Sequence, residues 1–394
     1  MPTQHSTPRR IRLFDTTLRD GEQAPGNAMR PPQKLDLALT IEALGVDVVE
    51  AGFPSSSPSE FQAVKMISES LTSAHVATLN RALPQDIHLA VEAGGTERHH
   101  LQVMATGSEI HLKHKRGIGQ AEAQREVVAA IALARSLGVR HVTLAIEDAS
   151  RGSDALLRPL ITESVAAGAD TLTIADTTGC MVPAQYGALI GRVRSWVAAD
   201  VTISTHCHED LGLALANALA GVDAGAQEVQ ATLAGIGERA GNTSLEELIA
   251  VLTYKAEELH STTTARTEGL WAAFEALSEA IGLPAPRNKA LFGVNAFATQ
   301  AGIHQAGLLR SHLSYEYVEP SRFGRERTML VGRHSGRAVL RHVLTEMRAP
   351  ADDQLVEELY ETYIANRGDG TCLRLSELRA LIDEHRTAPA GGRP

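Results

Sequence analysis

The chain is poor in cysteine and has no long apolar segment. Its 394 residues include only three cysteines, Cys180, Cys207 and Cys372, which lie far apart. So few scattered thiols exclude a disulfide framework and fit the reducing cytoplasm, where we expect the protein to reside. No apolar run approaches the roughly 20 residues of a membrane-spanning helix. The polar segment 1–10 does not resemble a secretory signal, so we expect no membrane association.

Two further features are missing. The chain has no excess of positive charge, since its net charge is −10, and this argues against a nucleic-acid partner. No GxGxxG motif follows the first predicted strand, which removes the main support for a dinucleotide-binding fold. The remaining composition, 43% hydrophobic and 21% charged, is that of an ordinary globular protein. A chain of this length can form one large domain and a smaller one.

Eight short β-like runs alternate with longer segments that are apolar at helical spacing. Several helical segments end in glycine just before the next strand, as helix C-termini commonly do. Eight β-then-α units are typical of a TIM (β/α)8 barrel, with a doubly wound open sheet as the alternative. The predicted strands are residues 11–14, 46–53, 75–80, 101–106, 141–146, 171–176, 202–208 and 228–233.

The sequence after the last predicted strand differs in character. A predicted helix over 244–255 closes the barrel, so we expect residues 1–255 to form the catalytic TIM barrel. Residues 256–386 are predicted to form a helix-rich C-terminal subdomain that completes the active site, with an amphipathic helix over 352–365. The tail, 387–394, is rich in Gly, Pro and Ala, and we expect it to be disordered.

Ionisable side chains follow the predicted strands, and active sites of TIM barrels lie at the carboxyl ends of their strands. His206 and His208 end the seventh strand, where alternate residues share a face, so two imidazoles aim at one spot. Imidazole is a common metal ligand, although two ordinary polar residues at a strand end are the alternative. Asp20 follows the first strand, which neighbours the seventh across the eighth in a closed barrel, and Asn242 follows the eighth. Such a set suits Mg²⁺, Mn²⁺, Zn²⁺ or Co²⁺ and leaves two positions for substrate oxygens.

Four motifs occur in order, each after a predicted strand: DTTLRDGEQ at 15–23, ADT at 175–177, HCH at 206–208 and GIGERAGN at 235–242. Together they resemble the signatures of the 2-isopropylmalate synthase, homocitrate synthase and citramalate synthase family, across roughly residues 10–345. The resemblance implies an acyl-CoA-dependent C-acyltransferase that condenses acetyl-CoA with a 2-oxo acid and then hydrolyses the thioester. More distantly, the barrel is similar to 3-hydroxy-3-methylglutaryl-CoA lyase and to pyruvate carboxyltransferase domains.

The resemblance implies a role for each residue of the predicted metal site. Asp20, His206 and His208 would bind the divalent metal, with Asn242 as a further ligand or as a neighbour of the ligands. The metal would chelate the carboxylate and keto oxygen of the 2-oxo acid. Arg19 would neutralise the negative charge that develops on that oxygen, unless it is an ordinary salt-bridge arginine.

The resemblance also implies residues that bind the two substrates. Thr177 would hydrogen-bond the 2-oxo acid carboxylate, although a threonine at this point can also cap a helix. Gln23 and His111 are implied to lie against the same substrate. The glycine-rich loop after the eighth strand would hold the phosphates or pantetheine of coenzyme A, unless its glycines only permit a tight turn. The loop residues implied are Gly235, Gly237 and Arg239.

A base must remove a proton from the acetyl methyl group, which is a very weak acid. Glu147 matches the carboxylate of the family's fifth strand, and His304 matches a histidine of the post-barrel subdomain, with Tyr315 nearby. The alternatives are a loop carboxylate for Glu147, a structural histidine for His304 and plain packing for Tyr315. Because the family's subdomain reaches over the barrel of the partner subunit, the resemblance implies a homodimer.

Four positions depart from the family pattern. Lys113 and His114 stand where Glu and Tyr are usual, Glu209 replaces an Asn and Thr299 replaces a histidine. The basic pair favours a doubly anionic 2-oxo acid such as 2-oxoglutarate, oxaloacetate or a phosphono- or phosphinopyruvate, unless both side chains face solvent. The absence of the regulatory domain common in leucine-pathway members points the same way. The alternatives are a short 2-isopropylmalate or citramalate synthase and a lyase of the 3-hydroxy-3-methylglutaryl-CoA type.

Overall fold

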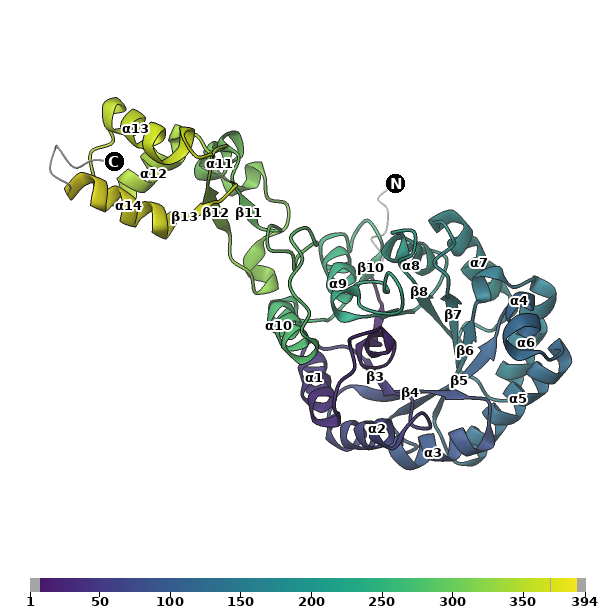
Figure 1. Cartoon of the computed structure of the whole chain (residues 1–394). Coiled ribbons are helices and arrows are strands. Elements are labelled where there is room, and N and C mark those ends of the chain that lie inside the picture. Colours follow the sequence, from purple (N-terminus) through teal and green to yellow (C-terminus); the bar gives the residue numbers. More distant parts are fainter. Residues whose placement is uncertain (1–7, 369, 388–394) are drawn as a thin grey trace. The chain divides into compact units, whose positions relative to one another are not determined.

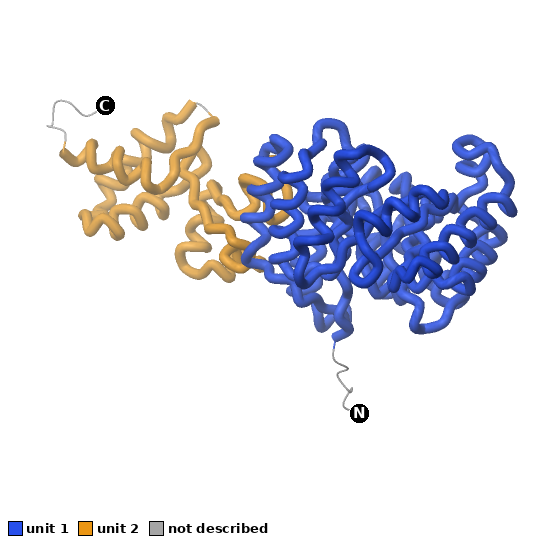
Figure 2. Tube along the Cα trace, turned by 90° about the horizontal axis from the view of Figure 1, so that it is seen from below, with its two compact units in different colours: residues 1–284 blue, residues 285–394 orange. Residues whose placement is uncertain are grey.

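The computed structural model describes residues 8–368 and 370–387, and the chain divides into two compact units, residues 1–284 and 285–394 (Figure 2). The first unit extends beyond the boundary at residue 255 expected from the sequence. It includes helix α10 (Leu270–Ile281), which packs against α1 (Pro31–Ala43). Residues 388–394, most of the tail expected to be disordered, lie outside the described residues.

The first unit is a closed barrel of eight parallel strands (Figure 1). The first barrel strand, β2, pairs with β3 on one side and with β9 on the other, which closes the sheet. The predicted TIM barrel is therefore confirmed, and the doubly wound open sheet is excluded. The strands are β2 (Arg12–Asp15), β3 (Val48–Gly52), β4 (His75–Arg81), β5 (His99–Thr106), β6 (His141–Glu147), β7 (Thr171–Asp176), β8 (Thr202–Cys207) and β9 (Glu228–Ala231).

Helices surround the barrel and bury their apolar faces against the strands (Figure 1). Four of them begin with proline, whose missing N–H is not needed in the first helical turn. Ser57 caps one of these four and Ser153 caps a further helix, each by accepting a backbone N–H. The further helices of the ring are α2 (Pro58–Ser70), α3 (Pro84–Gly94), α5 (Gln120–Ser136), α6 (Asp154–Ala166), α7 (Pro183–Trp196), α8 (Ala214–Asp223) and α9 (Leu245–Tyr254).

The inside of the barrel is largely polar. Successive strand residues face opposite sides, so Leu101 and Val103 of β5 pack against the helices while Gln102 faces inward. Phe14, Val48 and Ala77 form only a small separate apolar cluster. The other inward side chains must therefore find hydrogen-bond partners within the barrel, because an unpaired buried polar group is costly.

The second unit has a core of its own, which includes Val331, Leu340, Leu359 and Ile382. It is helix-rich, as predicted. The amphipathic helix expected over 352–365 is present as α13 followed by a π-helical turn, η8. Every helix in the described residues is too short or too polar to span a lipid bilayer. The elements of the unit are β11 (Ala298–Thr299), α11 (Gly302–Arg310), β12 (Thr328–Val331), α12 (Arg337–Glu346), α13 (Asp353–Tyr360), η8 (Glu361–Ala365), β13 (Leu373–Arg374) and α14 (Leu375–Thr387).

One buried cation links three segments of the barrel. Lys34 of α1 is fully buried, and its Nζ lies 2.5 Å from Glu22 Oε2 and 2.7 Å from Glu60 Oε1 of α2.

We predict that Lys34→Met lowers the free energy of unfolding by up to about 3 kcal/mol, because it leaves two carboxylates facing each other without a cation. Urea unfolding measures the loss, with exposed Lys65→Met in α2 as control. Equal midpoints for the two variants would contradict the prediction.

Candidate active site

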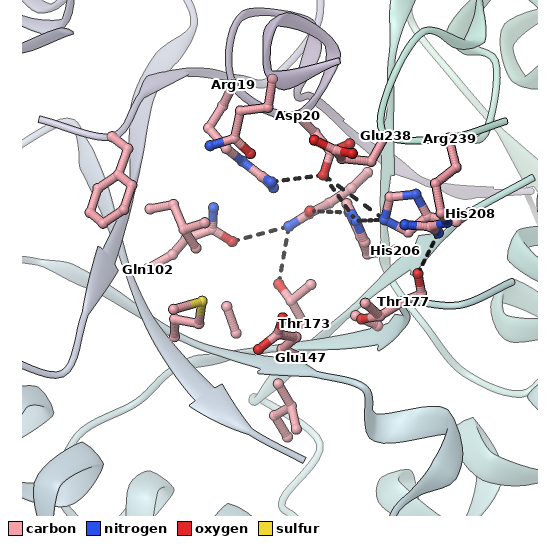
Figure 3. A pocket seen from close by; sticks show the side chains of 18 residues that line it. Arg19, Asp20, Gln102, Glu147, Thr173, Thr177, His206, His208, Glu238 and Arg239 are labelled. Atoms are coloured by element: carbon pink, nitrogen blue, oxygen red, sulfur yellow. Dashed lines mark hydrogen bonds and ion pairs between the residues drawn. The ribbon is translucent and has the colours of Figure 1, made fainter. Parts of the chain in front are cut away.

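A cavity of about 350 Å³ lies at the carboxyl ends of the barrel strands, where the sequence predicts the site (Figure 3). One part of its lining is polar and carries most of the residues predicted from the sequence. The other part is apolar. The polar lining includes Arg19, Asp20, Gln23, Glu147, Thr177, His206, His208 and Arg239, and the apolar lining consists of Phe53, Leu79, Met104, Ala145, Ile146 and Ala175.

Asp20, His206 and His208 converge at the wall of this cavity, and all three are buried. The Nε2 atoms of the two histidines lie 3.2 Å apart, and Asp20 Oδ2 lies 3.6 Å from Nε2 of His206 and 4.0 Å from Nε2 of His208. Cys207, between the histidines, is buried among the apolar residues outside the barrel. The alternation expected from the spacing therefore places both imidazoles on one side.

The protonation state of His206 suits a metal ligand. Its Nδ1 donates to Gln230 Oε1 at 2.9 Å, which leaves the Nε2 lone pair facing Asp20 and His208. Burial lowers the pKa of His206 to about 3, so the ring is neutral at physiological pH. Two neutral imidazoles and a carboxylate directed at one point form a donor set that fits a divalent metal ion.

Asp20 carries the negative charge of this set. Burial alone would raise its pKa, but the charge of Arg19 and the hydrogen bond from Asn242 favour the ionised form and hold the pKa below its ordinary value. Arg19 Nη1 donates to Asp20 Oδ2 at 2.7 Å. The backbone N–H of Asp20 donates to Thr16 Oγ1, which caps a π-helical turn, η1 (Thr17–Gly21). This turn places the Asp20 carboxylate inside the mouth of the barrel.

A chain of buried hydrogen bonds joins the two sides of the barrel below the cavity. Arg19 Nε donates to Glu50 Oε2 at 2.8 Å, and Glu50 Oε1 accepts from Gln102 Nε2 at 2.5 Å. Gln230 Nε2 donates to Gln102 Oε1 at 3.1 Å, and the same Gln230 orients His206. The sequence analysis missed these partners. The signal that could have found them is a polar residue within a strand that is otherwise apolar.

Asn242 lies against the carboxylate of Asp20. Its Nδ2 donates to Asp20 Oδ1 at 2.6 Å and to the backbone oxygen of Ile236 at 3.2 Å. Its Oδ1 is buried and has no hydrogen-bond partner in the described part of the chain. Asn242 thus orients the carboxylate of Asp20, and its unpaired Oδ1 leaves open the ligand role that was also considered from the sequence.

The glycines of the loop after β9 permit close packing. A Cβ on Gly237 would lie 2.1 Å from Asn242 Nδ2 and 2.9 Å from Asp20 Oδ1, and a Cβ on Gly235 would lie 2.5 Å from Ser244 Oγ. These contacts support the tight-turn alternative for both glycines and leave their expected role in binding coenzyme A without support.

Arg239, the third residue expected to bind coenzyme A, is already paired. Its Nε and Nη2 donate to the two carboxylate oxygens of Asp210 at 2.7 and 2.8 Å. Nη2 also donates to the backbone oxygen of Thr177 at 2.6 Å. The guanidinium thereby links the loop after β9 to the end of β7, and it lies at the edge of the cavity (Figure 3). An arriving phosphate would have to compete with a bidentate carboxylate.

The residues expected to bind the 2-oxo acid divide into two groups. Gln23 and Thr177 line the cavity. Thr177 Oγ1 accepts the N–H of Asp148 at 2.8 Å, so its own proton remains available for a substrate carboxylate. His111 and Lys113 do not line the cavity. His111 lies near Asp148, while Lys113 and its neighbour His114 are exposed, as the solvent-facing alternative expects.

The three residues expected to provide the base lie in different units. Glu147 lines the cavity, and both of its carboxylate oxygens accept from Lys115 Nζ, at 2.7 and 2.6 Å. His304 and Tyr315 belong to the second unit, where their rings lie together with centroids 4.3 Å apart, and both are exposed. Within that unit the two rings form a solvent-accessible pair that lies outside the apolar core.

The fold and the site define a TIM barrel with a candidate divalent-metal site at the carboxyl ends of its strands. A family model described as HMGL-like matches residues 10–273, and one described as homocitrate synthase post-HMGL domain-like matches residues 291–368. The chain thus belongs to the 2-isopropylmalate synthase and homocitrate synthase family of acetyl-CoA-dependent condensing enzymes, as the sequence motifs predict.

Curated relatives agree with this assignment. The 2-isopropylmalate synthase of Solidesulfovibrio magneticus is 41% identical over 360 residues, which cover 90% of this chain and 69% of the relative. That of Halothermothrix orenii is 37% identical over 381 residues, covering 95% and 73%. Among solved structures, the HMG-CoA lyase of Pseudomonas aeruginosa shares the fold with a TM-score of 0.62 at 21% identity, covering 74% of this chain and 97% of that one.

We predict that Gly237→Ala weakens binding of Mn²⁺ by about 10- to 100-fold, the usual effect of disturbing the groups that orient metal ligands. The added Cβ must displace Asn242 and Asp20, and the φ of +154° disfavours a side chain. Isothermal titration of the chelator-treated protein measures the affinity. Gly119→Ala, where a Cβ meets nothing within 4 Å, is the matched control. Equal Mn²⁺ affinities of the two variants would show that metal binding does not require the absence of a side chain at Gly237.

Proposed function

We propose that the chain condenses acetyl-CoA with a 2-oxo acid that has an apolar side chain, 2-oxoisovalerate first, and releases 2-isopropylmalate and CoA. The apolar part of the cavity lining carries this proposal, and the names of the relatives support it. It replaces the doubly anionic substrate expected from Lys113 and His114, which do not line the cavity. Of the alternatives weighed from the sequence, the short 2-isopropylmalate synthase fits best.

The charges of the cavity also favour an apolar side chain. Arg19 and Arg239 are the only arginine or lysine residues among the described residues that line it. Arg19 is paired with Asp20 and Glu50, and Arg239 is paired with Asp210. A second anionic group on the substrate would therefore lose water without gaining a free cation, which is costly. An isopropyl group against Leu79 and Met104 has no such cost.

The residues of the cavity match the steps of a Claisen condensation, after which water hydrolyses the thioester and releases CoA. A bound divalent metal supplies Lewis acidity toward the keto oxygen and carboxylate of the 2-oxo acid. Arg19, fixed by Glu50, presents positive charge where the keto oxygen becomes negative. Thr177 donates its hydroxyl proton to the substrate carboxylate. Glu147 accepts the proton that leaves the acetyl methyl group, either directly or together with His304 and Tyr315.

The proposal includes the homodimer implied by the family resemblance. His304 and Tyr315 are exposed side chains of a unit that has its own core. Both rings are therefore accessible to the barrel of another subunit. We propose that they serve the barrel of the partner subunit. Acetyl-CoA would then enter between groups supplied by two chains.

The substrate prediction is tested by thiol release from acetyl-CoA with Mn²⁺ or Mg²⁺ present. We expect kcat/KM for 2-oxoisovalerate to exceed that for pyruvate by about tenfold or more, since each methylene in an apolar pocket contributes about 1–3 kcal/mol. Oxaloacetate and 2-oxoglutarate should be poorer still. Lys113→Met should leave this order unchanged. A preference for the dianionic acids that Lys113→Met abolishes would restore the basic-rim hypothesis.

The shared site is tested by co-expressing two inactive variants, His206→Gln and His304→Gln. If the second unit serves the partner's barrel, half of the dimers are mixed and each has one intact site, so activity returns to about a quarter of wild type. If both units act within one chain, no mixed dimer is active. Light scattering of the wild type measures whether the protein is dimeric at all.

A further inference from the structure

We propose that His75, His100 and His141 form a second transition-metal site, at the amino-terminal end of the barrel. The three residues stand at the starts of the neighbouring strands β4, β5 and β6, whereas the cavity described above lies at the ends of the strands. None of them takes part in the proposed condensation. The ligand is a borderline divalent ion that prefers imidazole, such as Zn²⁺ or Co²⁺.

The strand register brings these imidazoles together. His100 pairs directly with His141 in the sheet, and one ring nitrogen of each of the three residues lies within 4.8 Å of the others. His75 Nδ1 and His100 Nε2 are 3.1 Å apart. A tetrahedral zinc ion with bonds of about 2.0–2.1 Å requires ligand nitrogens about 3.3 Å apart, so this pair is already at the required spacing.

The third ring must turn for all three nitrogens to meet. His100 and His141 are stacked, with centroids 4.5 Å apart and 8° between their planes, and parallel rings cannot both direct their lone pairs at one ion. The His141 side chain is 38% exposed and contacts Asp170 at 3.8 Å, whereas His100 is buried. His141 is therefore the ring that is free to rotate, while His75 and His100 form the fixed part of the site.

The surroundings leave room for a ligand. His75 Nδ1 and His100 Nε2 share one hydrogen bond, so a metal ion would displace the proton between them. The charge of nearby Arg12 is balanced by Glu228, 3.0 Å away. The three histidines line a cavity of about 490 Å³. This space gives a metal ion an entry path and an open fourth position, which is how catalytic and exchangeable His₃ sites differ from closed structural ones.

The test is the zinc content of the full-length, chelator-treated protein after equilibrium dialysis against micromolar Zn²⁺. We expect two equivalents per chain in the wild type, one at the Asp20 site and one at the histidine cluster. His75→Gln/His141→Gln should bind one equivalent, and so should His206→Gln/His208→Gln. The matched control is His88→Gln, which removes an exposed imidazole from α3 and should leave two equivalents.

A second readout protects against a folding artefact. Co²⁺ in a low-coordinate histidine site absorbs visible light, and this band should disappear in His141→Gln. Because the His141 side chain is 38% exposed, we expect the circular dichroism spectrum to stay unchanged. Equal zinc content in the wild type and in His75→Gln/His141→Gln would overturn the proposal and leave the cluster as a hydrogen-bonded polar plug. Because neither readout uses turnover, failure of the proposed condensation would not affect the result.

Discussion

The structure depends on one arginine that serves two buried carboxylates. Arg19 bonds Asp20 through Nη1 and Glu50 through Nε, and both acids are buried at the mouth of the barrel. Burial raises the pKa of Glu50, so its charge is stable only beside the guanidinium. This arrangement ties the turn after β2 to β3. It also fixes the direction of the carboxylate that faces His206 and His208.

Charge pairing at the mouth continues as hydrogen bonding inside the barrel. Glu50 holds Gln102, Gln102 holds Gln230, and Gln230 fixes the tautomer of His206. Each glutamine uses both ends of its amide, so rotating any member leaves a buried group unpaired, which costs about 1–3 kcal/mol. His206 is therefore held in place from three strands. A polar interior, which would weaken an ordinary barrel core, here holds the site rigid.

The sequence predicts those features of the fold that depend on the spacing of hydrophobic and polar residues along the chain. Strand alternation placed His206 and His208 on one face, and repeated β-α units predicted the barrel, because both are properties of neighbouring residues. The partners of those histidines could not be predicted this way, since Gln102 and Gln230 meet only through barrel closure. Lys113 shows the converse case. It lies in a π-helical turn, Leu112–Arg116, and its side chain is exposed there, so its charge said little about the cavity.

Departures from a family pattern have a similar ambiguity. Glu209, which replaces the usual amide next to His208, accepts the backbone N–H of Ala214 with Oε2 at 2.7 Å, and Ala214 is the first residue of α8. A carboxylate at a helix N-terminus is favourable in itself because of the helix dipole. The substitution therefore has a structural explanation that needs no change of substrate, and only a fold can supply it.

The same pairing of charges determines where specificity can arise. Arg19 is paired with Asp20 and Glu50, and Arg239 is paired with Asp210. Neither arginine of the cavity lining is therefore a free cation for an incoming acid. In the proposed reaction, a metal bound by Asp20, His206 and His208 would take the carboxylate and keto oxygen, together with hydroxyl donors. Discrimination between side chains would then come from shape and from apolar contact, which distinguish acids by the methyl groups they carry.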